Sequence, residues 1–423
     1  MSRFKAYLER QCPPLIIENL SEKDQGSTLF VTIPCYDEPG LLTALHSLTQ
    51  CSPPSSAVTV IVAVNSSDKS SPEVLDQNQR TIREVLEWWK NSPRPFFQLR
   101  VLHAPSLPSK WAGVGWARKL AMDEAVRILD GSQTEEGILV AFDADSTVSA
   151  NYFTEIESAF RKNPSYNFVN LNFCHPVDDP VLPDSLREGI ILYELYLRYL
   201  RNAFEWCGYV HAIHTVGSSF AVRASSYVKQ GGMNRRQAGE DFHFLHKIVL
   251  LGEYGHVDGA TVYPAARISH RVPFGTGAAL KKWEEGDREL VSAYSLRIFE
   301  TLRPLFADPG YFFDTDPSVW EERFLQYDRK LYDYLAQIEM KERLTELRNN
   351  CADKRNFAKR FYHLVSAFRI IQYLNLCEAG EGGKGELAVE ASRLLEKLGA
   401  QENGNNNARE LLEIYRELDK KHA

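Results

Sequence analysis

Short apolar runs alternate with amphipathic helical patterns along the first two-thirds of the chain. Four runs with strand character, rich in β-branched residues, lie at residues 28–36, 57–65, 97–104 and 137–145. Each is followed by a segment whose apolar residues recur at helical spacing, at residues 40–48, 72–90, 114–129 and 151–162. Strands that alternate with helices predict an α/β fold, with a mainly parallel sheet that helices cover on both faces.

The pattern changes after about residue 277, where strand signals nearly disappear and charged amphipathic segments take over. Segments 319–338 and 357–376, for example, carry apolar residues at helical spacing. We therefore predict an N-terminal extension at 1–27, an α/β domain at 28–277 and a helical C-terminal domain at 278–423.

Composition narrows the classes of function. A formal net charge of −7 disfavours nonspecific nucleic-acid binding. The seven cysteines are scattered without a CxxC pair, and the first residues lack the apolar stretch of a signal peptide, which predicts reduced thiols in the cytoplasm. The most apolar helical segment, 187–206, is interrupted by Glu and Arg, so we expect no transmembrane span, whereas peripheral membrane contact stays possible.

Two aspartates, Asp143 and Asp145, stand where the fourth predicted strand ends. In a parallel sheet, ligands bind beyond the carboxyl ends of the strands, so the loops after Tyr36, Val64, Ala104 and Phe142 should share one rim. Carboxylates there can bind Mg²⁺ or Mn²⁺ together with the phosphates of a substrate. The plain alternative is a turn held by aspartate side chains.

Three further segments accompany this pair in order along the chain. "IPCYDEPG" ends the first strand, "SKWAGVGWARKLAMDEA" leads into a helix, and "QAGEDFHF" marks a later helix start. Together with the aspartates they resemble family 2 glycosyltransferases of the Rossmann-like GT-A fold, over roughly residues 28–277. The resemblance implies a nucleotide-diphospho-sugar donor, an acceptor hydroxyl of unknown kind, and Mn²⁺ or Mg²⁺.

The resemblance also implies roles for individual residues. The nucleotide-sugar would contact residues of "IPCYDEPG", of "SKWAGVGWARKLAMDEA" and of the aspartate pair: Pro34, Tyr36, Glu38, Lys110, Arg118 and Asp143. Within this set Asp143 would contact the ribose. Asp145 would bind the metal, and His270 is a candidate further ligand. Arg271, next to His270, would contact the diphosphate. Structural alternatives are capping acids in a loop, solvated cations at a helix start, and a structural histidine.

The Glu-Asp motif implies the catalytic residues. Asp241 would be the base that deprotonates the acceptor hydroxyl in an inverting transfer, and Glu240 would position the acceptor. The alternative for this pair is stabilisation of a helix N-terminus.

One departure from the family concerns the nucleobase. The second strand of the family usually ends in an Asp-Asp-Gly-Ser or Asp-Asn-Gly-Ser turn, whereas this chain has "VAVNSSDKSS". Asn65 or Ser66 must substitute, with Asp68 further on, so the base stays open between uridine, guanosine and deoxythymidine.

Three rival functions remain at the level of the sequence. A retaining GT-A transferase differs only in stereochemistry. A nucleotidyltransferase would normally carry a Gly-rich basic loop after the first strand, where this chain has "PCYDEPG". A noncatalytic nucleotide-sugar-binding protein would keep the fold and bind the donor without turnover.

Overall fold

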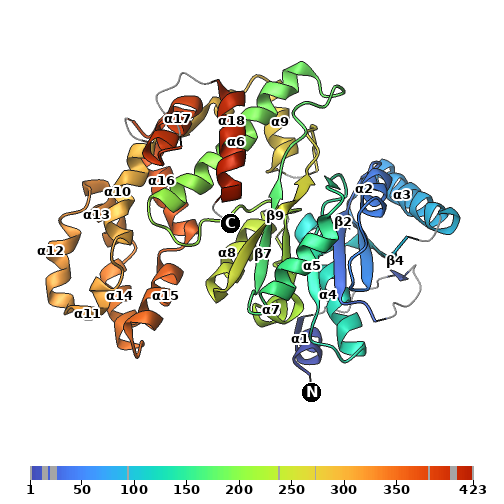
Figure 1. Cartoon of the computed structure of the whole chain (residues 1–423), viewed down its shortest axis with the longest axis horizontal. Coiled ribbons are helices and arrows are strands. Elements are labelled where there is room, and N and C mark those ends of the chain that lie inside the picture. The colour runs from blue at the N-terminus through green and yellow to red at the C-terminus, as the bar shows by residue number, and fades with distance from the viewer. Residues whose placement is uncertain are drawn as a thin grey trace. The chain divides into compact units, whose positions relative to one another are not determined.

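The computed structural model describes residues 2–11, 18–19, 26–92, 95–236, 239–271, 273–379, 382–400 and 407–421. Two compact units make up the chain (Figure 1). The first unit comprises Met1–Ile190, Thr215–Glu285 and Lys420–Ala423, and the second comprises Ile191–His214 and Gly286–Asp419. The domain boundaries expected from the sequence stay predictions, and half of the N-terminal extension lies outside the described residues.

The described part of the first unit holds one nine-stranded sheet, in the order β1-β4-β3-β2-β5-β8-β7-β9-β6. Its strands are β1 (Glu18–Asn19), β2 (Leu29–Cys35), β3 (Val58–Ser67), β4 (Phe97–Leu107), β5 (Ile138–Ala141), β6 (Thr147–Val148), β7 (Phe168–Phe173), β8 (Phe220–Arg223) and β9 (Tyr254–Tyr263). β4, β3, β2 and β5 run parallel, side by side. β8 is inverted between β5 and β7, which itself runs parallel to β9.

The helices of the first unit lie largely where the helical spacing predicts them. They are α1 (Arg3–Gln11), α2 (Leu41–Thr49), α3 (Pro72–Asn91), α4 (Val114–Gly131), α5 (Tyr152–Lys162), α7 (Ala224–Lys229), α8 (Glu240–Ile248), the 3₁₀ turn η1 (Val249–Leu251) and α9 (Thr276–Glu284). The helix α6 (Asp184–Trp206) begins in this unit and continues into the second. The predicted α/β sheet is confirmed, although β5 ends earlier than expected because the chain turns at Asp143.

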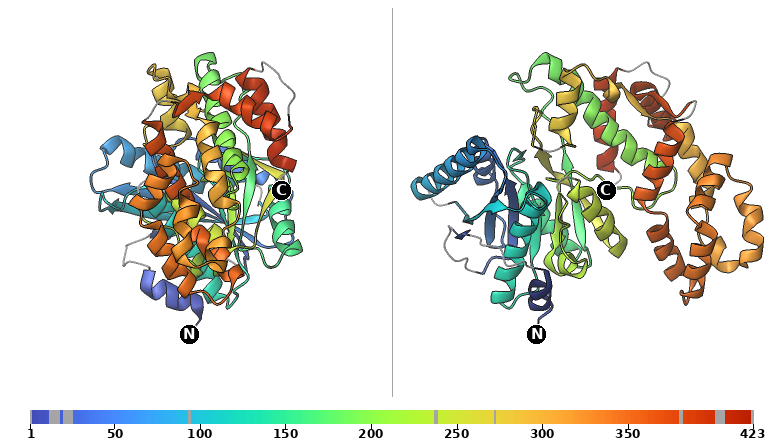
Figure 2. Two further views of the ribbon diagram at one scale, coloured as in Figure 1. Left: turned by 90° about the vertical axis from the view of Figure 1, so that its left-hand side faces the viewer. Right: turned by 180° about the vertical axis from the view of Figure 1, so that it is seen from behind.

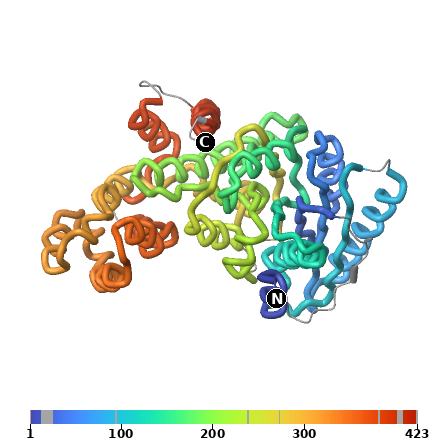
Figure 3. The backbone as a smooth tube through the Cα atoms, turned by 60° about the horizontal axis from the view of Figure 1, so that its bottom comes forward, coloured from blue at the N-terminus to red at the C-terminus, as the bar shows by residue number. Residues whose placement is uncertain are grey.

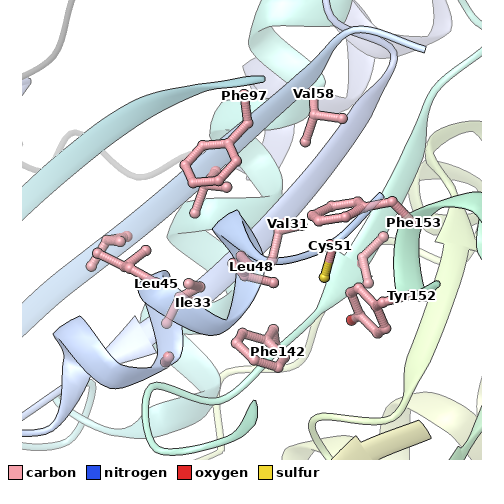
Figure 4. Close-up of a cluster of buried hydrophobic side chains, with 14 of the residues drawn as sticks. Val31, Ile33, Leu45, Leu48, Cys51, Val58, Phe97, Phe142, Tyr152 and Phe153 are labelled. Atoms are coloured by element: carbon pink, nitrogen blue, oxygen red, sulfur yellow. The ribbon is translucent and has the colours of Figure 1, made fainter. Parts of the chain in front are cut away.

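Helices lie against this sheet in the two views of Figure 2, and buried apolar side chains pack on both of its faces. On one face, Val31 and Ile33 of β2 pack with Leu45 of α2 and Phe153 of α5 in a single buried cluster (Figure 4). On the other face α4 lies against β2 and β3 and buries Trp116 completely. Burying a side chain such as Val, Leu or Phe contributes about 1.5–3 kcal/mol, so the two layers hold the strand ends in fixed positions.

A buried polar cluster attaches α1 to α4 and α7, and Figure 3 shows α1 beside α4. The Asp123 carboxylate accepts hydrogen bonds from the hydroxyls of Tyr7, at 2.7 Å, and Tyr227, at 2.8 Å. Lys119 donates to both Asp123 and Tyr7, each at 2.8 Å. These side chains satisfy one another, so the cost of burying their polar atoms is offset.

The second unit is helical, as the sequence predicts, apart from one small sheet. Its elements are η2 (Glu289–Val291), β10 (Ser292–Tyr294), α10 (Leu296–Phe306), α11 (Tyr311–Asp314), η3 (Pro317–Val319), α12 (Trp320–Phe324), α13 (Arg329–Gln337), α14 (Met340–Asn349), α15 (Lys354–Leu364), α16 (Ala367–Glu378), β11 (Lys384–Glu386), α17 (Leu387–Lys397) and α18 (Ala408–Lys421). The antiparallel pair β10–β11 was not expected from the sequence.

The two long amphipathic segments of this unit are each divided into shorter helices. Residues 319–338 contain a break before α13, where the Asp328 carboxylate accepts a hydrogen bond from the Lys330 main-chain N–H and caps a new helix. Residues 357–376 break at Val365 and Ser366, between α15 and α16. Among the described residues, none of the helices combines the length and the apolar composition that crossing a membrane requires.

The buried tyrosines of the first unit allow a matched stability test. Tyr7→Phe removes a hydroxyl that bonds to Asp123 and Lys119, and we expect the free energy of unfolding to fall by about 1–3 kcal/mol. Tyr152→Phe removes a buried hydroxyl that has no partner among the described residues, so it should leave the free energy of unfolding unchanged or raise it. Denaturant unfolding of both variants measures the free energy of unfolding. Equal losses in the two variants would show that the hydrogen bonds of the Tyr7 hydroxyl do not stabilise the fold.

Candidate functional site

The topology of the first unit brings several loops to one edge of its sheet. Because β2, β3, β4 and β5 are parallel and adjacent, the loops after them emerge at the same edge, as the sequence predicts. The inverted strand β8 starts at this edge, since Phe220 pairs with Ala141 near the end of β5. Residues 217–219 therefore lie beside the Asp143 turn.

The centre of the site is a buried guanidinium with its partners, which we call the Arg118 cluster: Arg118, Asp143, Gly217, Glu240 and Asp241. Arg118 of α4 donates to Asp143 Oδ1 at 2.8 Å, Glu240 Oε1 at 3.2 Å and the Gly217 carbonyl at 2.9 Å. The residue is only 1% exposed, and its acidic neighbours raise its pKa even though burial opposes this. A buried cation needs such partners, so Arg118 fixes three separate segments against one another.

Asp241, the predicted base, belongs to this cluster. A Cβ atom built on Gly217 would lie 2.9 Å from Asp241 Oδ2 and 3.0 Å from Arg118 Nη2, so only glycine allows this close approach. Loss of solvation, followed by repulsion from Glu240, raises the pKa of Asp241 to about 7. Burial also raises the pKa of Glu240, against the opposing effect of Arg118. A carboxyl group with a pKa near 7 suits general base catalysis at neutral pH.

A second group, the double-arginine cluster, consists of Glu38, Asp145, Arg267 and Arg271. Arg267 Nη2 contacts Glu38 Oε2 and lies 2.9 Å from Asp145 Oδ2. Arg271 places Nη1 2.5 Å from Glu38 Oε2 and Nη2 3.1 Å from Asp145 Oδ2. Both arginines come from the loop after β9, and Asp145 lies two residues from Asp143 of the Arg118 cluster.

The residues expected at the nucleotide occupy different surroundings. Pro34 is buried inside β2 and pairs with Ala63, so it shapes the strand end. Tyr36 is half-buried and its carbonyl accepts from Arg271 at 3.4 Å. Glu38 is fully buried, and its Oε1 accepts the Gly40 N–H at 2.7 Å. Glu38 is therefore connected to the site by its ion pairs with Arg267 and Arg271.

The end of β3 supplies a polar side chain with an unused acceptor. Asn65 is 2% exposed, its Nδ2 donates weakly to the Gly113 carbonyl at 3.4 Å, and its buried Oδ1 has no partner among the described residues. Further along, the exposed Asp68 accepts from the Ser109 hydroxyl at 2.6 Å. The ammonium of the exposed Lys110 lies 4.9 Å from the centre of the Trp111 ring.

The metal ligands expected from the sequence, Asp145 and His270, both lie among the described residues. His270 is exposed, and no contact with Asp145 is described for it. Over the described ranges, no group of three or more His, Cys, Asp and Glu side chains is arranged to hold a metal ion. Asp143 and Asp145 supply the oxygen ligands that Mg²⁺ and Mn²⁺ favour. However, guanidinium groups already pair with both, so a cation could bind Asp145 only after the arginines move.

One charged member of these clusters, Arg267, was missed from the sequence. Arg267 precedes Arg271 by four residues in "ARISHR", and neither its spacing nor a motif identifies its partners. Its assignment depends on the long-range contact with Glu38, which is 229 residues earlier in the chain.

Comparison with known proteins finds similarity to solved structures. No protein-family model and no curated protein matches the chain. The chain is similar to a solved structure of S. aureus TarS, with a TM-score of 0.40 and 14% identity over 78% of this chain and 54% of that chain, about half its length. It is also similar to TarS 1-349 in complex with UDP-GlcNAc, with a TM-score of 0.38 and 15% identity over 93% and 91% of the two chains. Likeness at these scores carries no functional argument.

The shifted acidity of Asp241 can be tested directly. Glu240→Gln removes the charge that repels the Asp241 carboxylate and frees Arg118 to stabilise it, so the pKa of Asp241 should fall below about 7. Titration of the aspartate carboxyl carbons by NMR measures this shift. Glu84→Gln, an exposed change on α3, is the control and should leave the Asp241 titration in place. An unchanged pKa in Glu240→Gln would show that the two carboxyl groups do not interact.

Proposed function

We propose that the chain is a glycosyltransferase that moves a sugar from a nucleotide-diphospho-sugar to an acceptor hydroxyl. The observation that supports this best is the placement of Asp241, whose pKa is raised to about 7, against the same guanidinium as Asp143 at the strand end. A carboxyl group of raised pKa and the loop after β5 thus lie at one edge of the sheet, which supports the roles of base and donor-binding loop. The resemblance of the motifs to family 2 enzymes points to the same reaction.

The proposed chemistry is a single displacement with inversion. The Asp241 carboxylate accepts the proton of the acceptor hydroxyl while the acceptor oxygen forms a bond to the anomeric carbon. The bond from that carbon to the diphosphate oxygen breaks, and the nucleoside diphosphate leaves with the electron pair. Glu240 stays paired with Arg118 and acts on Asp241 through its charge.

On the donor side we assign Asp143 to the ribose, Asn65 to the nucleobase, and the arginines of the double-arginine cluster to the diphosphate. Asn65 suits this role because its buried Oδ1 is free to accept from a base N–H. We further propose that Asp145 holds Mn²⁺ or Mg²⁺, which would supply positive charge at the leaving diphosphate. The contribution of His270, the acceptor and a cytoplasmic location stay predictions.

The function is tested by incubating the protein and Mn²⁺ with uridine, guanosine and deoxythymidine diphospho-sugars and a panel of hydroxyl acceptors, with products identified by mass spectrometry. Release of nucleoside diphosphate with a glycosylated acceptor is the expected result. Pyrophosphate release would indicate nucleotidyl transfer, and donor binding without turnover would indicate a noncatalytic binding protein. The anomeric configuration of the product, measured by NMR, separates inversion from retention.

The role of the base gives a specific prediction. Asp241→Asn keeps the shape of the side chain but removes the proton acceptor, so turnover should fall by about 10²–10⁴-fold while donor binding persists. Calorimetric titration with the active donor measures the binding. In the wild type, turnover should rise with pH through about 7, because deprotonation activates Asp241. Full turnover by the variant would remove Asp241 from the mechanism.

The close approach at Gly217 gives a second prediction with a matched control. Gly217→Ala inserts a methyl group against Asp241 and Arg118, so we expect turnover to fall by about 10²-fold from displacement of the base. Gly131→Ala, at the end of α4, meets no atom within 4 Å and should retain wild-type turnover. Comparable rates for the two variants would mean that the packing at Gly217 does not position Asp241.

A further inference from the structure

Each arginine of the double-arginine cluster contacts both of its carboxylates. Arg267 and Arg271 reach Glu38 Oε2 and Asp145 Oδ2 alike, and two guanidinium charges balance two carboxylate charges. Glu38 is completely buried, whereas the Asp145 side chain is 27% exposed and the Arg267 side chain 41%. The arrangement is therefore anchored at Glu38 and open toward Asp145.

The charges of the two clusters do not favour an added diphosphate. When all are ionised, five carboxyl groups (Glu38, Asp143, Asp145, Glu240 and Asp241) face three guanidinium groups (Arg118, Arg267 and Arg271). A diphosphate linked to a sugar brings two more negative charges, and a divalent cation would compensate them. Yet the carboxylate best placed for that cation, Asp145, is held by both arginines.

We propose that Arg267 and Arg271 act as positioning residues that exchange partners: they release Asp145 when a diphosphate accepts their N–H groups, and Asp145 then becomes available to a divalent cation. Diphosphate and cation therefore bind cooperatively, each weakly without the other. The inference rests on the proposed function only in taking a diphosphate as the substrate group.

The hydrogen bonds of Arg271 show how such an exchange keeps the buried acid paired. Arg271 uses Nη1 for Glu38 and Nη2 for Asp145, so Nη2 can pass to a phosphate oxygen while Nη1 remains with Glu38. A planar guanidinium with several donors can bind two acceptors in this way, which a lysine ammonium cannot match in geometry. Glu38, with no exposed surface, is never left as an unpaired buried charge.

The exchange is tested by titrating the whole 423-residue chain with Mn²⁺ and following free Mn²⁺ by electron paramagnetic resonance, with and without inorganic pyrophosphate. In the wild type, pyrophosphate should tighten Mn²⁺ binding by about 5- to 150-fold beyond the binding of Mn²⁺ to pyrophosphate alone. Arg267→Gln/Arg271→Gln should bind Mn²⁺ about tenfold more tightly than the wild type without pyrophosphate, and should lose the coupling. Arg267→Gln alone, at the more exposed position, should show the same changes in part.

Lys90→Gln, an exposed change at the end of α3, is the control for charge alone, because it removes a cation that belongs to neither cluster. Its Mn²⁺ affinity should stay close to that of the wild type. The proposal is overturned if Lys90→Gln raises Mn²⁺ affinity as much as the arginine changes do, or if the wild type binds Mn²⁺ equally well with and without pyrophosphate.

The outcomes also separate this inference from the proposed function. Sugar transfer without coupling between Mn²⁺ and pyrophosphate would support the proposed glycosyltransferase activity and contradict the exchange of partners. Coupling that disappears in the arginine variants, with no sugar transfer to any acceptor, would retain the exchange and count against the glycosyltransferase.

Discussion

The site depends on the buried positive charge of Arg118, which must be paired with hydrogen-bond acceptors. Arg118 lies on a helix packed against the sheet, with 1% of its surface exposed, and a guanidinium there is tolerable only if acceptors surround it. Asp143, Glu240 and the Gly217 carbonyl supply them from three distant segments. The requirement to satisfy one cation thus assembles the strand-end aspartate, the Gly217 turn and the start of α8.

Small residues make this assembly possible. A Cβ on Gly115 of α4 would lie 2.9 Å from Glu240 Cβ and 2.4 Å from the Arg236 carbonyl, so the absence of a side chain lets α8 begin against α4. Gly217 provides the same freedom on the other side of Arg118. The carboxyl group of Asp241 is consequently held in a crowded, poorly solvated position, and this packing is what raises its pKa.

Local patterns in the sequence predicted most of the scaffold and part of the site. Alternating strands and helices placed Asp143 and Asp145 at a strand end and Asp241 at a helix start, because these depend on periodicity and turn signals alone. The pairing of Arg267 with Glu38 could not be foreseen, since it depends on where the sheet places the loop after β9 relative to the loop after β2. The break before α13 was missed because Asp328 caps a helix inside a continuous amphipathic pattern.

The two clusters each include an aspartate of the same loop, but their arginines differ in exposure. Asp143 and Asp145 are separated by a single residue, yet one faces a guanidinium that is fully buried and the other faces guanidinium groups that are partly exposed. A buried guanidinium resists exchange, because removing its carboxylate leaves a charge in a medium that solvates it poorly. A partly exposed guanidinium can turn to another anion at lower cost, because water reaches it. The exposure of the arginines, rather than that of the two aspartates, therefore separates the clusters: Asp143 is fixed against Arg118, whereas Asp145 pairs with the arginines that we propose exchange partners.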